Sequence, residues 1–140
     1  MRSIKGEHRG RTITLPVVVL KSDNPQDLTH FMATALLDTG ASSSGLAPNI
    51  INSLGLRSIG KNNLVVATEL RPVDYYIFRI GLFEVKPDDS QSNKLPFIFA
   101  ETTGFKINSQ HNFDMILGMD VLSQCDFQMY RTGNWKLSFG

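Results

Sequence analysis

Short apolar segments separated by polar turns run along most of the chain. Thr12–Leu20 and Thr29–Leu37 are rich in β-branched and aliphatic residues, and a polar segment with the pair Asn24-Pro25 separates them. Such residues favour strands, and an Asn-Pro pair favours a turn. The pattern therefore predicts a hairpin whose second strand ends at Leu37.

Three further pairs of apolar segments predict hairpins: 64–68 with 73–80, 82–85 with 95–101, and 125–130 with 135–139. The first is expected to turn at Glu69–Pro72, because proline favours turns and removes a backbone donor. A short strand is expected around Ile116-Leu117, ending at a glycine. The segment Thr102–Asn112 is polar and is expected to be a connection.

One segment has the spacing of a helix. Within Leu46–Leu56, Pro48 suits the first turn, and Ile50, Ile51 and Leu54 form one apolar face. Gly55 is placed to end this helix. Many short strands, frequent turns and one short helix predict a mainly β domain, closed or barrel-like. Met119–Ser123 is a candidate for a further helical turn.

The 140 residues suffice for one domain with a proper core. Residues 1–11 are basic and contain few apolar side chains, so they are expected to form a flexible N-terminal arm, and residues 12–140 the domain.

Composition limits the function classes. A hydrophobic content of 41% and a charged content of 19% are typical of a globular protein, and a net charge of +1 gives no electrostatic reason to expect nucleic acid or an acidic membrane as partner. Cys125 is the only cysteine, so no internal disulfide is possible. The apolar runs are too short for a membrane span or a convincing signal peptide, which favours a cytoplasmic location.

The segment with the clearest chemistry is Asp38-Thr39-Gly40, which follows the predicted strand end Leu36-Leu37. A carboxylate at the shielded end of a strand is costly unless it is hydrogen-bonded or titrates unusually, which makes it a candidate for catalysis. The alternative is ordinary turn chemistry, because Asp-x-Gly is also common in turns.

Two elements together resemble one family. The segment Ala35–Ser42 resembles the catalytic motif of retropepsin-like aspartic proteases, and Ile116–Asp120 resembles the second signature of that family, an apolar pair followed by glycine. The helix that ends at Leu54-Gly55 also lies where the family has one. The resemblance extends from about Leu15 to Phe139 and is greatest to the single-domain members, since two-lobed pepsins need about twice this length.

The resemblance implies an acid-protease β-barrel and an aspartic endopeptidase. In this family two carboxylates share one proton, as the aspartic proteases illustrate generally. A chain with one such motif is therefore expected to act as a homodimer on a peptide or protein, with Asp38 from each copy and no cofactor or metal. The implied catalytic residues are Asp38, Thr39 and Gly40. The implied substrate-binding residues are Ala41, Ser42, Ala67, Thr68, Glu69, Ile116 and Leu117.

The resemblance also implies that Leu64–Ile80 is a flap over the substrate. Viral flaps carry glycines at the tip, whereas the expected turn here is Glu69-Leu70-Arg71-Pro72. This difference keeps a second hypothesis open, a non-catalytic peptide-binding or dimerisation module with the same fold.

Other reactive residues are given less weight. Asp120 is expected to be a turn or cap residue, because the family places a structural turn there. His8, His30 and His111 lack the spacing of metal ligands. Cys125 is expected to be a buried thiol.

Overall fold

The structure is a computed structural model that describes residues 1–8, 10–66, 69–84, 95–108 and 112–140, and strands dominate it. The strands in chain order are β1 (Arg2–Glu7), β2 (Thr14–Lys21), β3 (His30–Leu37), β4 (Gly45–Leu46), β5 (Lys61–Val66), β6 (Glu69–Leu82), β7 (Phe97–Ile98), β8 (Thr102–Lys106), β9 (Met115–Leu117), β10 (Asp126–Met129) and β11 (Asn134–Phe139). The predicted mainly β fold is confirmed.

Two helices accompany the strands, α1 (Pro48–Leu54) and α2 (Met119–Leu122). The expected helix is confirmed as α1: Pro48 lies in its first turn, and Gly55 ends it in a left-handed conformation with φ of 62°. The helical turn expected at Met119–Ser123 also forms, as the four-residue α2. Gly118 precedes α2 in an extended conformation, and Val121 and Leu122 anchor it in the core.

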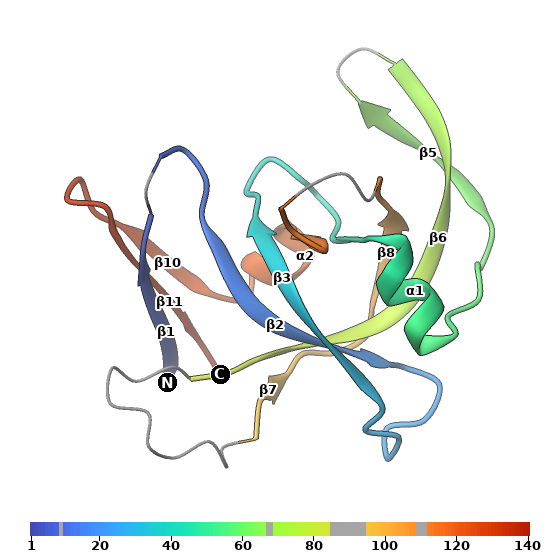
Figure 1. The fold of residues 1–140 in the computed structure, drawn as a ribbon, viewed down its shortest axis with the longest axis horizontal. Helices are drawn as coiled ribbons and strands as arrows, with labels where there is room; N and C mark the ends of the chain where they lie inside the picture. Colours follow the sequence, from blue (N-terminus) through green and yellow to red (C-terminus); the bar gives the residue numbers. More distant parts are fainter. Residues whose placement is uncertain (9, 67–68, 85–94, 109–111) are drawn as a thin grey trace.

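Most strands belong to one sheet of order β2-β3-β9-β4-β8-β6-β5, in which β7 adds to β6 (Figure 1). β2 also pairs with β6, so the strands from β2 to β6 in this order are joined at both ends of the series. The predicted hairpin of β2 and β3 is confirmed by its register from Thr14 opposite Leu36 to Leu20 opposite His30. The description of this sheet as a closed barrel stays a prediction.

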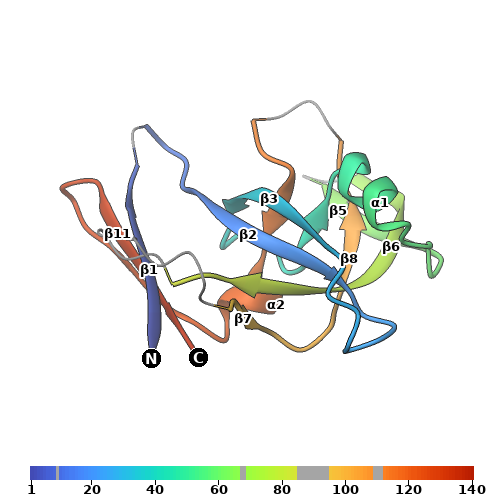
Figure 2. The same ribbon diagram turned by 60° about the horizontal axis from the view of Figure 1, so that its bottom comes forward.

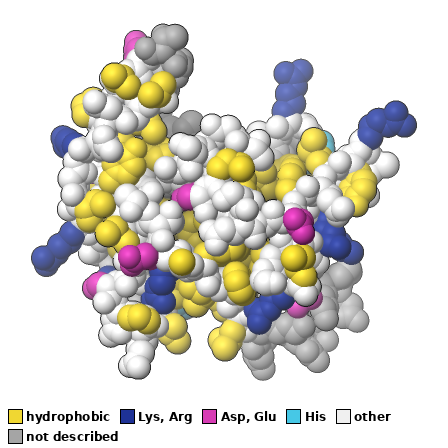
Figure 3. Space-filling model, turned by 180° about the vertical axis from the view of Figure 1, so that it is seen from behind, with side chains coloured by type: hydrophobic (Ala, Val, Ile, Leu, Met, Phe, Trp, Pro, Cys, Tyr) yellow, Lys and Arg dark blue, Asp and Glu magenta, His cyan; other side chains and the backbone are white. Residues whose placement is uncertain are grey.

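The hairpin of β5 and β6 forms as predicted, but its turn does not lie at Glu69–Pro72. Those four residues belong to β6, and the register pairs Val66 with Glu69 and Asn63 with Pro72. Among the described strands, this part of β6 pairs with β5 alone, so Pro72 lies at an edge of the sheet, where proline is tolerated. The hairpin projects from the body in Figures 1 and 3. Ala67 and Thr68 lie outside the described residues.

The segment expected to be a polar connection, Thr102–Asn112, contains β8. This strand pairs with β6 and β4, and Gly104 lies so close to Ser44 and Phe78 that a side chain at 104 would overlap them. Only Phe105 among its five residues is large and apolar, so local hydrophobicity did not indicate a strand. The hairpin predicted from segments 82–85 and 95–101 is represented by the pairing of β6 with β7, in which Leu82 lies opposite Phe97. Residues 85–94 lie outside the described part of the chain.

The two ends of the chain form a second sheet of order β1-β11-β10 (Figure 2). The expectation of a flexible arm over residues 1–11 is wrong for residues 2–7, which pair with β11 from Arg2 opposite Phe139 to Glu7 opposite Asn134. Ile4 is only 2% exposed in the main core. The pairing is long-range, so the polar composition of residues 1–11 did not reveal it. The boundary at residue 12 stays a prediction.

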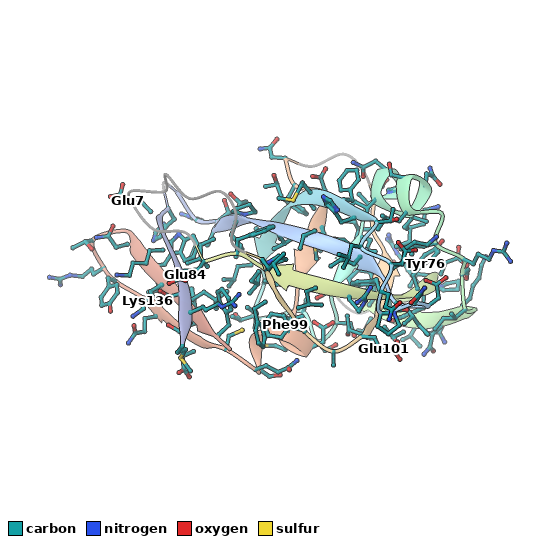
Figure 4. The ribbon with its side chains drawn as sticks, turned by 90° about the horizontal axis from the view of Figure 1, so that it is seen from below. Glu7, Tyr76, Glu84, Phe99, Glu101 and Lys136 are labelled. Carbon is teal, nitrogen blue, oxygen red and sulfur yellow. The ribbon has the colours of Figure 1, made fainter. Side chains whose placement is uncertain are left out.

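The second sheet lies at one end of the molecule. Figure 4 places Glu7 and Lys136, from β1 and β11, at the end opposite Tyr76 of β6. The predicted last hairpin is confirmed by β10 and β11, which pair from Asp126 opposite Ser138 to Met129 opposite Trp135. Among the described residues, no helix has the length and apolar character needed to cross a membrane.

Replacement of Ile4 by alanine tests whether β1 is part of the folded structure. Because the Ile4 side chain is buried, Ile4→Ala should lower the free energy of unfolding by about 2–4 kcal/mol. Its exposed neighbour provides the control, and Lys5→Ala should change that free energy by less than about 0.5 kcal/mol. Urea denaturation measures both, and equal small effects would mean that residues 2–7 do not pack on the domain.

Candidate active site

The carboxylate of Asp38 lies where two parallel strands end side by side. Leu37 of β3 pairs with Leu117 of β9, and the Asp38 N–H then donates to the Leu117 carbonyl at 3.0 Å. The Leu37 N–H donates to the Ile13 carbonyl at 2.9 Å. The last residues of β3 are thus held from both sides, which fixes the position at which Asp38 leaves the sheet.

A tight turn holds the Asp38 side chain after the strand. Asp38 Oδ1 accepts a hydrogen bond from the Gly40 N–H at 2.9 Å, and the Asp38 carbonyl accepts one from the Ala41 N–H at 3.2 Å. A Cβ at position 40 would lie 3.3 Å from Oδ1, so glycine leaves room for this arrangement. Asp38 and Ala41 are half-buried, whereas Thr39, Gly40 and Ser42 are exposed. The carboxylate is therefore oriented by the chain and remains accessible from outside.

A second carboxylate, that of Asp120, holds the loop that follows this turn through hydrogen bonds. Asp120 Oδ1 accepts from the Ser44 hydroxyl at 2.7 Å and the Val121 N–H at 3.0 Å. Asp120 Oδ2 accepts from the Ser44 N–H at 3.0 Å and the Thr102 hydroxyl at 2.7 Å. Four donors from three segments thus meet on one half-buried carboxylate. This agrees with a structural role for Asp120, although it joins more segments than a cap would.

Gly118 brings the two signature segments into backbone contact. Its N–H donates to the Ser44 hydroxyl oxygen at 3.1 Å, and the next N–H, of Met119, donates to the Ala41 carbonyl at 2.8 Å. A Cβ at position 118 would lie 2.7 Å from the Ser43 carbonyl carbon and oxygen. Such contacts are too short for a real side chain, so only glycine fits here without movement of the loop.

Comparisons with known proteins agree with this arrangement. The family model described as aspartyl protease matches residues 30–121, which includes the Asp38 turn and the Gly118 segment. The chain belongs to the aspartyl protease family. No curated protein matches it significantly.

Two solved structures resemble this aspartyl protease family member. A retropepsin-like aspartic protease from Rickettsia conorii matches with a TM-score of 0.58 and 15% identity, over 98% of this chain and 93% of that one. The retroviral protease-like domain of Ddi1 from Leishmania major matches with a TM-score of 0.41 and 15% identity, over 87% and 85%. The first likeness confirms the retropepsin-like fold.

The predicted substrate-binding residues of this family member differ in their position and in how far they are exposed. Ala41 and Ser42 follow Asp38 directly, Ile116 is half-buried, and Leu117 is fully buried behind the turn. Glu69 is exposed and pairs with Arg71 at 3.2 Å, an arrangement that contributes little to stability. Ala67 and Thr68 lie outside the described residues. The contacts of this set with a substrate stay predictions.

Sequence reasoning missed two residues of the site, Ser44 and Thr102. Ser44 is completely buried, and both residues donate to Asp120. Single hydroxyl residues in a serine- and threonine-rich chain carry no local signal, because their partners lie 76 and 18 positions away. In the described part of the chain, no three His, Cys, Asp or Glu side chains are grouped to hold a metal, and His111 lies outside it.

Removal of the Asp120 carboxylate should destabilise the protein. Asp120→Ala would leave the two buried Ser44 donors and the Thr102 hydroxyl without their acceptor, and we expect a loss of about 2–4 kcal/mol in the free energy of unfolding. The control Asp126→Ala removes an exposed carboxylate and should cost less than about 0.5 kcal/mol. Thermal or urea unfolding compares the two, and similar losses would argue against the proposed support.

The Cys125 thiol should be poorly reactive. Burial, with a smaller contribution from the Asp126 charge, raises the pKa of Cys125 from 9.0 to about 11. Because the thiolate is the nucleophile, iodoacetamide should modify Cys125 at pH 8 about 100-fold more slowly in the folded than in the urea-unfolded chain. The folded rate should then rise steeply towards pH 11. Equal rates in both states at pH 8 would contradict the raised pKa.

Proposed function

We propose that this protein is a homodimeric aspartic endopeptidase in which Asp38 from each of two copies forms the catalytic dyad. The observation that carries the proposal is the Asp38 carboxylate, oriented by the Gly40 N–H at the end of β3 yet accessible from outside. Membership of the aspartyl protease family supports the reaction class.

The need for a second copy follows from the number of available carboxylates. The motif Asp-Thr-Gly occurs once in the chain. Asp120, the acid in the second signature segment, is the other candidate for a second catalytic carboxylate. Its two oxygens already accept hydrogen bonds from four internal donors. Thr39 and Gly40, which follow Asp38 directly, are exposed in the single copy. The proposal therefore assigns the second carboxylate to a partner that approaches this exposed turn, with Thr39 hydrogen-bonding across the two-fold axis.

The proposed reaction needs the two carboxyl groups to share one proton. The ionised Asp38 takes a proton from a water molecule, whose oxygen adds to the carbonyl carbon of the peptide bond, while the protonated Asp38 of the other copy donates to the carbonyl oxygen. The C–N bond then breaks as the leaving nitrogen accepts the proton that the first Asp38 took from water. The second Asp38 at the same time recovers its proton from a hydroxyl group of the tetrahedral intermediate, which becomes the carboxylic acid of the product. Because the two groups are coupled, their pKa values belong to the pair.

The hairpin of β5 and β6 is the proposed cover of the bound peptide. It projects from the body (Figure 1), and β5 is the edge strand of its sheet. A cover of this kind excludes water from the reaction, and an extended peptide is held largely through its backbone. In this proposal Ala41, Ser42 and Ile116 line the floor, and Glu69 contacts the peptide from the hairpin. The expected contacts of Ala67 and Thr68 belong to residues outside the described part of the chain.

The alternative function, a non-catalytic module, loses one of the two observations that favoured it, because the sequence still has no glycine between Gly60 and Gly81. The lost observation was a proline-containing turn at Glu69–Pro72 in the hairpin tip, and these residues lie within β6 instead. Family membership supports the endopeptidase, and the non-catalytic module stays the alternative to be tested against it.

The proposal is tested by replacing Asp38 with asparagine. Asp38→Asn keeps the size of the side chain but cannot share the proton, so cleavage of a diverse peptide library between acidic and neutral pH should fall at least about a thousandfold. The wild-type rate should follow a bell-shaped pH profile, because the dyad is active only while it holds one proton. Light scattering in the same buffers should give the mass of a dimer.

The control variant is Asp23→Asn, which removes an exposed carboxylate in the loop between β2 and β3 and should keep full activity. Circular dichroism and sizing must show that both variants are folded dimers. Undiminished cleavage by Asp38→Asn would refute the dyad. A folded wild type that cleaves no peptide at any pH would favour the non-catalytic module.

A further inference from the structure

One edge of the second sheet is open. In the order β1-β11-β10, the strand β10 pairs with β11 on one side, and no described strand pairs with its other side. The Tyr130 N–H, directly after β10, donates to the Asn134 carbonyl of β11 at 2.8 Å. Because the direction of hydrogen bonding alternates along a strand, Gln128 also bonds towards β11, whereas the N–H and C=O groups of Phe127 and Met129 point to the open edge.

The side chains of β10 do not protect this edge. Edge strands in natural proteins are commonly kept from pairing with other chains by charged residues, proline or bulges. The other edge strand of the sheet, β1, carries charges at Arg2, Lys5 and Glu7. β10 carries one charge, at Asp126 in its first position, and its last residue, Met129, is 62% exposed. β10 is therefore the edge at which this sheet can add a strand.

An apolar row ends at this edge with an exposed side chain. Met129 lies directly opposite Trp135 of β11, and residues opposite one another in paired strands share one face of the sheet. Trp135 is only 4% exposed, and Phe127, on the same face as Met129, packs against the core. An added strand would therefore extend the buried row beyond Met129 and cover it.

A second copy of β10 fits this edge. When a strand pairs with its own copy about a two-fold axis perpendicular to the sheet, opposite residues share a face and the outward backbone groups must meet. Both conditions are satisfied when Phe127 lies opposite the partner's Met129, because both residues point their backbone groups outward. Gln128 then lies opposite the partner's Gln128 on the other face. This register opposes no like charges, which would be destabilising.

We propose that the second copy of the proposed homodimer binds at β10, so that the two second sheets join into one sheet of order β1-β11-β10-β10-β11-β1. This inference rests on the proposed function, because the dyad of Asp38 residues is the reason to expect a second copy. The His8 N–H donates to the Gly133 carbonyl in the turn after β10, and the Leu37 N–H donates to the Ile13 carbonyl. The connection from β1 to β2 is thus bonded both to this turn and to the strand end that carries Asp38.

Disulfide cross-linking tests the proposed register. Residue 128 of the two copies would form a non-hydrogen-bonded pair, whose Cα atoms lie about 4.5 Å apart, within the range of a disulfide. Mild oxidation should therefore convert most of the Gln128→Cys protein into a covalent dimer. The control Lys5→Cys places an exposed cysteine on β1, the other edge of the same sheet, and should stay monomeric on a non-reducing gel. Equal cross-linking of the two variants would overturn the proposal.

The dissociation constant of the dimer, measured by analytical ultracentrifugation, tests the interface without a cross-link. Met129→Lys places a charge opposite the partner's Phe127 at two symmetric positions, so it should raise this constant at least about a hundredfold, or tenfold for each position. The matched control is Met32→Lys, because Met32 of β3 is 52% exposed and Met129 is 62% exposed. It should leave the constant unchanged. Circular dichroism must show that both variants are folded, and equal effects of the two would contradict the interface.

The Asp38→Asn protein separates failure of the interface from failure of the proposed function. With Gln128→Cys added, it should cross-link as completely as Gln128→Cys alone. Cross-linking at residue 128 in a protein whose wild type cleaves no peptide would support the interface and favour the non-catalytic module. A dimer that cleaves peptides but is unaffected by Met129→Lys would overturn the interface and leave the endopeptidase intact. A wild type that stays monomeric at all concentrations would overturn both.

Discussion

The carboxylate of Asp120 is the interaction on which the candidate active site depends. It accepts four hydrogen bonds, from Ser44, Thr102 and Val121, and so ties the loop after Asp38 to β8 and to the start of α2. An ionised carboxylate is the one side-chain group that only accepts and has room for four donors. A hydroxyl or amide in its place would bring donors of its own and leave some of these groups unpaired. The burial of Ser44 makes each of its unpaired donors costly.

Close contacts between backbone segments also hold the loop that follows Asp38. Gly118 and Gly104 lie against Ser43 and Ser44, at distances that exclude a side chain. Because β3 and β9 run parallel and end together, Asp38 leaves the sheet beside Leu117, and the loop then folds back over Gly118. The glycine of the second signature is therefore needed for contact with the first, which explains why the two segments occur as a pair in one chain.

In the proposed homodimer, the loop after Asp38 is already shaped within each single copy. The Gly40 N–H orients the Asp38 carboxylate without help from a partner, so a second copy would add its own carboxylate to a prepared site. Prepared groups lose little freedom when substrate binds, which is a large part of how enzymes lower activation barriers.

The sequence by itself determined the fold class, the helix α1, the first and last hairpins and the position of Asp38 at a strand end. These features depend on neighbouring residues: alternating apolar positions, Pro48 and Gly55 at the helix ends, and an apolar run that leads into Asp38. The turn expected at Glu69–Pro72 was wrong because the local preference of proline was outweighed by pairing with β5. Only the tertiary structure decided that residues 2–7 pair with β11, that Thr102–Lys106 is a strand, and that Ser44 and Thr102 converge on Asp120. Each of these joins residues far apart in the chain, and polar segments whose partners are distant carry no periodic pattern that would indicate them.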